Sequence, residues 1–379
     1  MIYRHRKHRG NFLDSKKVIN DLISQIKDVL KIGPSGFIGI DVGLSSVKVA
    51  QLDGNEESGF KLVAYGSEPL PEGAIIEDDI QKEEEVIEAI RSAIEKAGIS
   101  SVNAVLGLAG PNTVARKLQL AGGSEEEIED QVSWEVEQYI PFSLETSKVS
   151  FHIVGENEGG GVDVIVAAAK GEVVESYREL LEKAGLKPKI FDLGLLAVVN
   201  VFELVYSEKL EDPNESWILM DLGAQKTEFI IYKNNKIMFT KEIMIGGVII
   251  TEEIQRQMGV NYYEAEDLKN HGDENGNLPE EILEIIDSVV ESFFAEIKKT
   301  VDFYISSTSD ESFVECVLTG GSSLIPGLTE GLEALLGISV SIMNPFEAIE
   351  YDPKKIKEDQ LNEIAYRGAG VLGLAMRSV

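Results

Sequence analysis

The sequence predicts an α/β protein made of two related domains that face each other. One repeated pattern carries this prediction: an apolar strand, Asp, any residue, Gly, a short polar turn and a second apolar strand. The pattern occurs at residues 39–52 and again at residues 219–232. A third strand is expected after each copy, at 60–65 and at 236–243. Two matching β-meanders in one chain, separated by helical segments, indicate a duplicated α/β domain.

The first domain is expected to begin at Phe37, because the Gly-Pro-Ser-Gly segment at 33–36 breaks any helix that enters it. After the first meander, apolar residues at helical spacing predict a helix over 83–97 that ends at Gly98. The apolar run at 102–108 predicts a buried strand.

Residues 110–189 have the size and the element order of a small inserted subdomain. Ser124 followed by Glu127 is a capping box, which opens the first helix of this unit. The expected elements are a strand at 113–120, a helix from Ser124 to Tyr139, strands at 149–154 and 162–169, and a helix at 172–184.

The remaining elements complete the second domain and return to the first. Pro279 suits the first turn of a long helix, because its backbone angle is already helical and its missing N–H needs no partner there. The expected elements are a buried apolar helix at 191–206, the second meander, helices at 251–258, 264–270 and 279–306, a strand at 313–318, a helix at 324–336, a strand at 340–343 and a terminal helix at 358–376.

The composition limits the classes of function. The net charge is −31, so binding of nucleic acid through a basic surface is not expected. No apolar stretch approaches the about 20 residues that span a bilayer. Cys316 is the only cysteine, which excludes an internal disulfide and fits a reducing cytoplasm. Its place in an apolar run indicates a buried strand residue rather than a catalytic thiol.

Residues 1–35 differ from the rest of the chain. The first ten residues carry four Lys or Arg and no acid, and apolar residues follow at helical spacing over 18–30. Such a basic amphipathic segment is typical of a helix that lies on an anionic membrane or docks on a partner. A solvent-exposed extension, or a start codon assigned too early, explains it equally well, and both interpretations stay open.

The first turn contains residue types that bind a phosphate and a metal ion. Backbone amides of a Gly-bearing turn and nearby hydroxyls bind phosphate oxygens, and a Lys adds positive charge. A carboxylate holds a metal ion directly or through water. The candidates are Asp41, Gly43, Ser45, Ser46 and Lys48, with Asp41 as the metal-ion ligand. A tight turn chosen only for its geometry is the alternative interpretation.

The second turn repeats this chemistry. The candidates are Asp221, Gly223, Gln225 and Thr227, with Asp221 as the second metal-ion ligand. Thr227 either contacts a terminal phosphate or satisfies the turn. The long side chains of Gln225 and Lys226 either reach the phosphates or point to solvent.

Three further segments offer the remaining walls of a nucleotide site. A Gly-rich loop between a strand and a helix lets the backbone approach a base or a phosphate, and the helix N-terminus favours an anion. The candidates there are Gly320, Gly321 and Ser322. Gly246 and Gly247 open another helix, and Glu266 and Lys269 share a helix face within reach of a ribose or an adenine. A plain turn or a surface pair remains the alternative for each group.

The order of these motifs resembles the actin-like ATPase superfamily, which includes actin, the sugar kinases, DnaK-type chaperones and FtsA. Its phosphate-one, phosphate-two and adenosine motifs match residues 39–52, 219–232 and 317–323, and its two connecting helices match 191–206 and 364–376. The resemblance covers nearly all of residues 36–379. It implies two ribonuclease-H-like domains around a nucleotide cleft, with ATP and Mg²⁺ as cofactors.

Within that superfamily the chain is most similar to the PilM family of type IV pilus assembly. Residues 40–48 and 134–142 are close to PilM segments, and the unit at 110–189 lies where PilM and FtsA carry an inserted subdomain. The chain ends soon after the second connecting helix, whereas FtsA continues into a linker and a membrane-binding helix, so PilM is favoured. The implied parts are an extension at 1–35, domain I at 36–109, 190–215 and 344–379, the inserted subdomain at 110–189, domain II at 216–250 and 307–343, and its helical subdomain at 251–306.

The resemblance implies a cytoplasmic protein at the cytoplasmic face of the inner membrane, associated with the membrane only peripherally. Its expected partners are the cytoplasmic N-terminal tail of PilN, other proteins of the pilus inner-membrane platform, and copies of itself. The PilN tail is expected in a groove among residues 100–190, between domain I and the inserted subdomain. ATP hydrolysis is expected to be slow, with Asp192 or Asp221 orienting water. An FtsA-like filament-forming division protein and a small-molecule kinase of the same fold are the alternatives.

Overall fold

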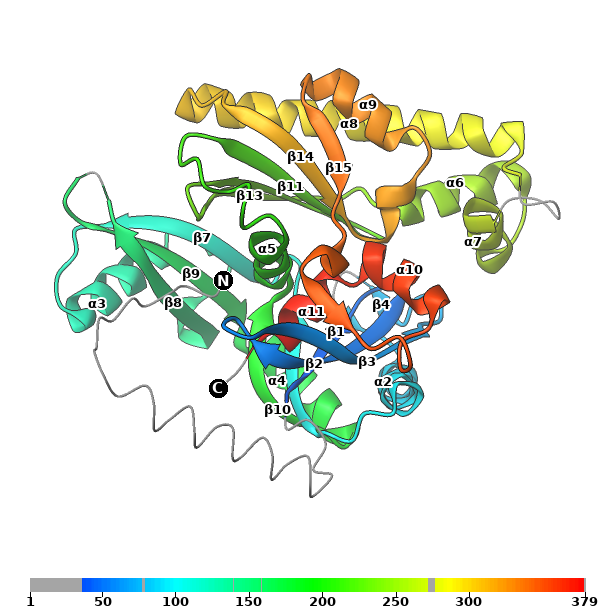
Figure 1. Cartoon of the computed structure of the whole chain (residues 1–379), viewed down its shortest axis with the longest axis horizontal. Coiled ribbons are helices and arrows are strands. Elements are labelled where there is room, and N and C mark those ends of the chain that lie inside the picture. The colour runs from blue at the N-terminus through cyan, green and yellow to red at the C-terminus, as the bar shows by residue number, and fades with distance from the viewer. Residues whose placement is uncertain (1–35, 77–78, 139, 158, 272–276, 378–379) are drawn as a thin grey trace.

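The computed structural model describes residues 36–76, 79–138, 140–157, 159–271 and 277–377 (Figure 1). The expectations for the extension at 1–35 and for Tyr139 lie outside these residues. The described chain forms two sheet-and-helix domains, one above the other in Figure 1, with a third, smaller sheet to their left.

Domain I is built on a six-stranded mixed sheet. The two hairpins β1–β2 and β2–β3 are antiparallel, whereas β1, β6 and β10 run parallel to one another. In spatial order the strands are β10 (Lys187–Leu193), β6 (Asn103–Leu108), β1 (Ile38–Val42), β2 (Ser46–Asn55), β3 (Gly59–Pro69) and β16 (Ile349–Tyr351). A short hairpin of β4 (Ile75–Ile76) and β5 (Asp79–Ile80) follows β3.

Domain II repeats the arrangement in a five-stranded sheet. Here β11–β12 and β12–β13 are antiparallel, and β11, β14 and β15 are parallel. In spatial order the strands are β13 (Lys236–Ile243), β12 (Thr227–Lys233), β11 (Ser216–Leu222), β14 (Phe313–Thr319) and β15 (Ser339–Ile342). The predicted pair of matching meanders is therefore confirmed.

The inserted subdomain is an antiparallel sheet of β7 (Thr113–Leu120), β9 (Val162–Lys170) and β8 (Ser147–Glu156), with β9 in the centre. Helix α3 (Glu125–Val136) covers one face through Ile128, Val132 and Val136. The predicted capping box is present: the backbone N–H of Glu127 donates to the Ser124 hydroxyl, and the backbone N–H of Ser124 donates to the Glu127 carboxylate. Helix α4 (Gly171–Lys183) leads back to β10 in domain I.

The other helices cover the two larger sheets and join them. They are α2 (Glu83–Ala97), α5 (Gly194–Val205), α6 (Gly247–Met258), α7 (Tyr262–His271), α8 (Glu280–Thr308), α9 (Leu328–Leu336), α10 (Glu358–Arg367) and α11 (Ala369–Ala375), with short 3₁₀ turns η1 (Leu144–Thr146), η2 (Gly321–Leu324) and η3 (Pro345–Glu347). The long helix predicted to begin at Pro279 is present as α8, with Pro279 as its N-cap one residue before the first helical position.

Several helix boundaries differ from the sequence prediction: α6 begins four residues earlier than expected and α9 four residues later, and two larger differences have a physical reason. The helix expected over 191–206 begins only at Gly194, because residues 187–193 pair with β6 as the edge strand β10. A continuous apolar run does not separate a buried strand from a buried helix by its periodicity. The single terminal helix expected over 358–376 is divided into α10 and α11 at Gly368.

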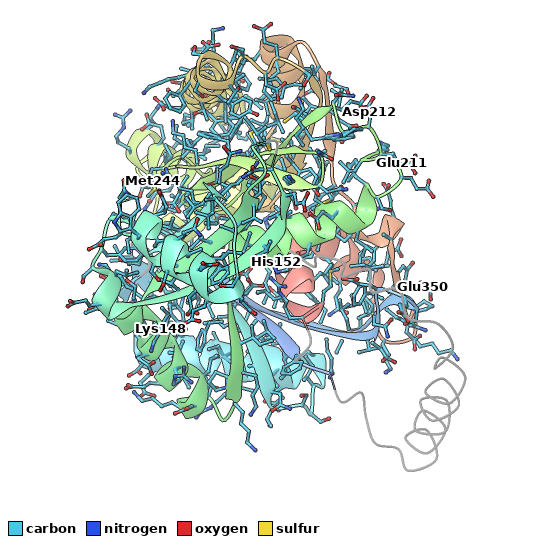
Figure 2. The ribbon with its side chains drawn as sticks, turned by 90° about the vertical axis from the view of Figure 1, so that its left-hand side faces the viewer. Lys148, His152, Glu211, Asp212, Met244 and Glu350 are labelled. Carbon is cyan, nitrogen blue, oxygen red and sulfur yellow. The ribbon has the colours of Figure 1, made fainter. Side chains whose placement is uncertain are left out.

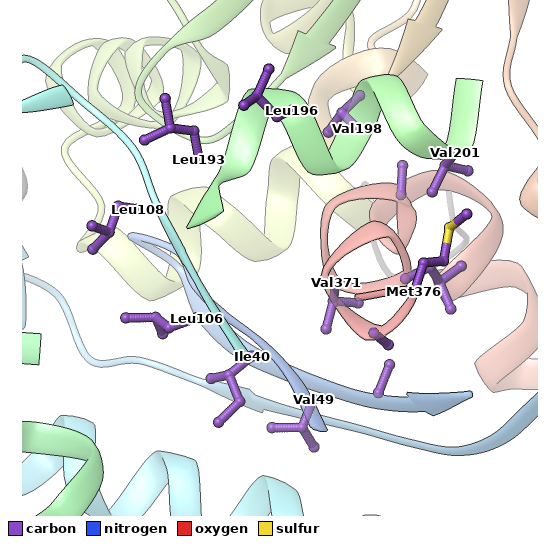
Figure 3. Close-up of a cluster of buried hydrophobic side chains, with 14 of the residues drawn as sticks. Ile40, Val49, Leu106, Leu108, Leu193, Leu196, Val198, Val201, Val371 and Met376 are labelled. Carbon is purple, nitrogen blue, oxygen red and sulfur yellow. The ribbon is translucent and has the colours of Figure 1, made fainter. Parts of the chain in front are cut away.

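The connecting helices α5 and α11 cross at very short range. A Cβ added to Gly373 of α11 would lie 1.9 Å from the carbonyl oxygen of Ala197 in α5. Val371, Met376, Val198 and Val201 from these two helices join Ile40 and Val49 from the sheet in one core (Figure 3). The crossing thus requires glycine and fixes both helices on the sheet of domain I.

Helix α5 also contacts domain II through its aromatic end. Phe202 lies 5.3 Å from Tyr232 of β12 and 5.9 Å from Trp217 of β11, measured between ring centroids, with the rings edge to face. The Tyr232 hydroxyl donates to the carboxylate of Glu203 at 2.6 Å. The connecting helix α5 therefore forms part of the contact between the two domains.

Cys316 is fully buried in β14, as predicted, and burial raises the pKa of its thiol. It belongs to the core of domain II, which α8 covers with Ile286, Val290, Phe293 and Ile297. Among the described residues no helix combines the length and apolarity needed to cross a bilayer.

The contact between β1 and α11 gives a stability test. A Cβ at Gly39 would lie 2.5 Å from the carbonyl oxygen of Val371 and 2.6 Å from the amide nitrogen of Ala375. Gly39→Ala is therefore expected to destabilise the protein by about 1–3 kcal/mol, as overpacking of a rigid core does. Gly370→Ala in α11 is the control, since its Cβ would meet nothing closer than 3.9 Å. Equal melting temperatures for the two variants would contradict this packing.

Candidate functional site

The two predicted phosphate turns have the same geometry. The amide of Gly43 donates to the carbonyl of Ser46 at 3.1 Å, and the amide of Gly223 donates to the carbonyl of Lys226 at 2.9 Å. Each turn is thus closed by its own glycine. The amides of the other turn residues, together with the exposed Ser45 and the half-buried Ser46, are the groups suited to a phosphate.

Asp41 and Asp221 occupy equivalent places, at the ends of β1 and β11. Asp41 faces Lys48 across the β1–β2 hairpin, and the Lys48 ammonium lies 3.0 Å from its carboxylate. The Asp41 side chain is one-third exposed, whereas that of Lys48 is 12% exposed. The predicted acid and base of the first turn therefore form one ion pair at the edge of the sheet.

Burial and then the negative charge of Asp41 raise the pKa of Asp221 to about 6, while Lys48 and Lys226 act in the opposite direction. The two carboxylates belong to different domains, so their repulsion acts across the space between them. A divalent cation would relieve it, and Mg²⁺ in phosphate sites uses one or two carboxylates plus substrate oxygens. No cluster of three or more His, Cys, Asp or Glu suited to a metal occurs in the described part of the chain. The donor set fits a metal ion that a nucleotide also ligates.

The second turn distributes its other side chains differently from the first. Thr227 is buried and donates its hydroxyl to the carbonyl of Ile245 at 2.8 Å, so it ties the turn to the loop before α6. Lys226 forms an ion pair with Glu242 at 2.7 Å rather than pointing into solvent. Gln225 is half-buried.

Glu228 of β12 is not among the site residues that the sequence motifs predict. It is paired with Asp221 in the β11–β12 ladder and with Glu242 in the β12–β13 ladder. Burial raises the pKa of Glu228, and Glu242 and Asp221 raise it further against the effect of Lys226. Only the strand register shows this row of carboxyl groups, because nothing in the local sequence singles out Glu228.

The Gly-rich loop after β14 docks directly on the second turn. The Ser322 hydroxyl donates to the carbonyl of Gly223 at 2.8 Å. Gly320 adopts a positive φ of 89°, and a Cβ there would lie 2.4 Å from the Asp221 carboxylate. The loop can approach Asp221 only because residue 320 is glycine.

Helix α6 starts on the same turn. The amide of Gly247 donates to the carbonyl of Gly223 at 3.2 Å, and that of Val248 donates to the carbonyl of Ala224 at 2.7 Å. A Cβ at Gly246 would lie 2.5 Å from the Ala224 carbonyl oxygen. In this structure the two glycines allow a close approach of backbone to backbone.

Glu266 and Lys269 of α7 lie against the start of α6. The Lys269 ammonium contacts Glu266 at 2.6 Å, the Thr251 hydroxyl at 2.7 Å and the Gly247 carbonyl at 3.2 Å. Burial alone would raise the pKa of Glu266, but Lys269, Thr251 and Asn270 outweigh it and hold the pKa below its ordinary value. The predicted pair thus lies beside Gly247, within the same group of segments as the turns.

Asp192 lies in the same row as Asp41, since both are paired with Gly107 of β6. One of its carboxylate oxygens accepts from Arg377 at 2.5 Å, and the other accepts from the amide of Leu193. Its side chain is 8% exposed. The structure thus gives Asp192 an ion pair with the C-terminal segment, and its role in orienting water stays a prediction.

The family model described as "Type IV pilus assembly protein PilM" matches residues 39–379. The chain belongs to the PilM family. A chain of the solved "PilM-PilN type IV pilus biogenesis complex" superposes with a TM-score of 0.80 at 28% identity, covering 91% of this chain and 99% of that one.

More distant relatives of this PilM-family chain share its fold. The cell division protein FtsA of Enterococcus hirae is 24% identical over 356 residues, which is 82% of this chain and 78% of that protein. FtsA of Pseudomonas aeruginosa is 23% identical and covers 89% of this chain and 88% of its own length. The ethanolamine utilization protein EutJ of Carboxydothermus hydrogenoformans superposes with a TM-score of 0.56 at 14% identity. The predicted actin-like ATPase fold is confirmed.

The raised pKa of Asp221 predicts a pH-dependent stability. The folded chain binds a proton at Asp221 up to about pH 6, whereas the ordinary value is 3.8, so stability falls as the pH rises through this window. Asp221→Asn removes the ionisable group. The melting temperature of the variant minus that of the wild type should therefore grow between pH 4 and pH 7 and then level off.

Asp41→Asn gives the matching control. It removes the neighbouring negative charge and should lower the pKa of Asp221, so the pH range over which stability changes should become narrower. A difference in melting temperature that stays constant from pH 4 to pH 8 for Asp221→Asn would contradict the assignment.

Proposed function

We propose that this protein is an ATP-binding scaffold of the type IV pilus assembly machinery, which works at the cytoplasmic face of the inner membrane. In this proposal MgATP lies between the two domains, and the inserted subdomain binds the cytoplasmic N-terminal tail of PilN. The observation that carries the proposal is the opposition of Asp41 and Asp221 beside twin glycine turns in a chain of the PilM family.

The residues around the turns fit a nucleotide in named roles. Lys48 would contact the terminal phosphates, together with the turn amides and the hydroxyls of Ser45 and Ser46. Asp41 and Asp221 would hold Mg²⁺, which supplies neutralisation of phosphate charge when bound. The Gly320 and Gly321 backbone and the Glu266–Lys269 pair would contact the nucleoside.

Slow hydrolysis is part of the proposal. Asp192 is paired with Arg377, so as placed here it does not offer a free carboxylate to a water molecule. Asp221 lies near the end of β11 beside the second turn, which makes it the better-placed candidate for orienting a water molecule. The bound nucleotide then acts chiefly by setting the relation between the domains.

The proposed partner site lies on an open edge of the inserted sheet. A cavity of about 460 Å³ separates β7 from β13, the edge strand of domain II, and its lining includes Leu118, Ile165, Met238 and Phe239. Both β7 and β13 are edge strands, so those of their outer backbone groups that do not contact the facing strand are suited to pairing with an extended peptide. This cavity differs from the sequence expectation, because domain II rather than domain I forms its second wall.

Polar contacts connect that cavity to the nucleotide-binding domain. Asp163 of β9 accepts from Lys236 of domain II at 2.8 Å and lies 3.1 Å from Lys117 of β7. The Thr240 hydroxyl of β13 donates to the carbonyl of Ala115 in β7 at 3.3 Å. A change in the angle between the domains would therefore move one wall of the cavity relative to the other.

The second open edge offers the competing location. Strand β8 is exposed along most of its length, with Lys148 and His152 at the surface (Figure 2) and with Val149 and Ile153 each 37% exposed. The two edges are distinguishable by substitution, because Met238 lines only the cavity and Val149 lies only on β8.

Calorimetry tests nucleotide binding. Lys48→Ala is expected to raise the dissociation constant of MgATP roughly 10–100-fold, because a charge-assisted contact is lost. Binding of a peptide that copies the PilN tail should stay unchanged. Lys61→Ala, at an exposed position of β3, is the control and should bind MgATP like the wild type. No detectable binding of MgATP to the wild type would overturn the proposed function.

The partner site has its own pair of variants. Met238→Arg is expected to weaken the PilN-tail peptide at least tenfold by placing a long charged side chain in the cavity, whereas Val149→Arg should have no effect. The reverse result would place the peptide on the β8 edge. Unchanged affinity in both variants would remove the inserted sheet as the binding site.

The FtsA relatives support one alternative, a filament-forming role in cell division. Sedimentation of the full chain with MgATP and with vesicles of anionic lipid separates the two functions. Nucleotide-dependent pelleting together with failure to bind the PilN-tail peptide would favour the FtsA-like function.

A further inference from the structure

The last residue of α10, Arg367, lies against the Gly-rich loop of domain II. A Cβ added to Gly321 would be 3.1 Å from Nε of Arg367 and 3.5 Å from its Cγ. The Arg367 side chain thus runs along the backbone of the loop, and a side chain at residue 321 would have to displace it. The residue is nevertheless exposed, so its guanidinium is accessible from the space next to the loop.

The electrostatic surroundings of Arg367 are unusual for so acidic a protein. The pKa of Lys269 is lowered by burial first, with the positive charge of Arg367 lowering it further against the effect of Glu266. Lys269 has its ion pair with Glu266, whereas no ion pair of Arg367 occurs among the described residues. Two cations from different domains therefore lie near each other, one of them without a carboxylate, and an electron-rich ligand between them would be stabilised.

The neighbours of Arg367 place it on the nucleoside side of the site. The charges that act on Asp221 are those of Asp41, Lys48 and Lys226, which mark the phosphate and metal side. The charge of Arg367 instead lowers the pKa of Lys269. Gly320 lies against Asp221 and Gly321 lies against Arg367, so the loop separates Arg367 from Asp221. A planar guanidinium stacks well on a flat π-system and gains from its charge there.

We propose that Arg367 binds the base of the bound nucleotide, with the face of its guanidinium that is turned away from the Gly321 backbone stacked on a purine ring. This inference rests on the proposed function, since it names a residue of the same site that the sequence motifs do not include. It makes α10, which leads into the connecting helix α11, a wall of the base pocket. Arg367 then discriminates the base rather than the number of phosphates.

Calorimetry on the full chain tests this with four ligands: MgATP, MgADP, MgCTP and magnesium triphosphate. Arg367→Ala is expected to weaken MgATP and MgADP equally, by about tenfold, and to leave magnesium triphosphate unaffected. The preference for MgATP over MgCTP should fall, because a purine offers the larger stacking surface. Arg367→Lys keeps the positive charge but lacks the planar guanidinium. Compared with Arg367→Ala, it should therefore recover less than half of the lost binding free energy.

Lys355→Ala, an exposed position just before α10, is the matched control and should bind all four ligands like the wild type. Equal weakening of magnesium triphosphate and MgATP in Arg367→Ala would overturn the inference in favour of a phosphate contact. Unchanged MgATP affinity in a variant with wild-type melting temperature would also overturn it. Failure of the wild type to bind any nucleotide would instead overturn the proposed function, so the two failures are distinguishable.

Discussion

The close crossing of α5 and α11 is the constraint on which the rest of the structure depends. Gly373 allows these helices to touch backbone to backbone, and Gly39 brings β1 equally close to α11. The phosphate turn that follows β1 is therefore built on a rigid base. The same crossing delivers Arg377 to Asp192, and it places the aromatic end of α5 against domain II. One packing contact thus helps to position the first phosphate turn, the contact of α5 with domain II and the C-terminal segment.

The two domains bring two negatively charged carboxylates, those of Asp41 and Asp221, toward each other. The sheets fix Asp41 and Asp221 at the ends of equivalent strands, so each domain contributes one carboxylate and one closed glycine turn. Their repulsion is tolerated because Lys48 and Lys226 are close by and because Asp221 takes up a proton at low pH. Such a site favours a ligand that places a cation between the two carboxylates.

The features that could be predicted from the sequence are those that depend on residues close together in the chain. The twin turns, the capping box at Ser124 and the long helix after Pro279 each depend on spacings of a few residues, and all are present. The strand β10 could not be separated from the helix after it, because both are apolar and buried. The Asp192–Arg377 pair and the approach of Arg367 to Gly321 join residues far apart in the chain, so only the folded topology shows them.

The burial of the only cysteine has a practical consequence for observing motion. Thiol-reactive dyes and spin labels need an accessible thiolate. Cys316 is buried, and burial raises the pKa of its thiol, so it does not react. A pair of cysteines engineered onto the surfaces of β8 and α8 would therefore carry the only labels, with no need to replace the native residue. The distance between such labels, followed as ligands are added, would report how far the inserted subdomain moves relative to domain II.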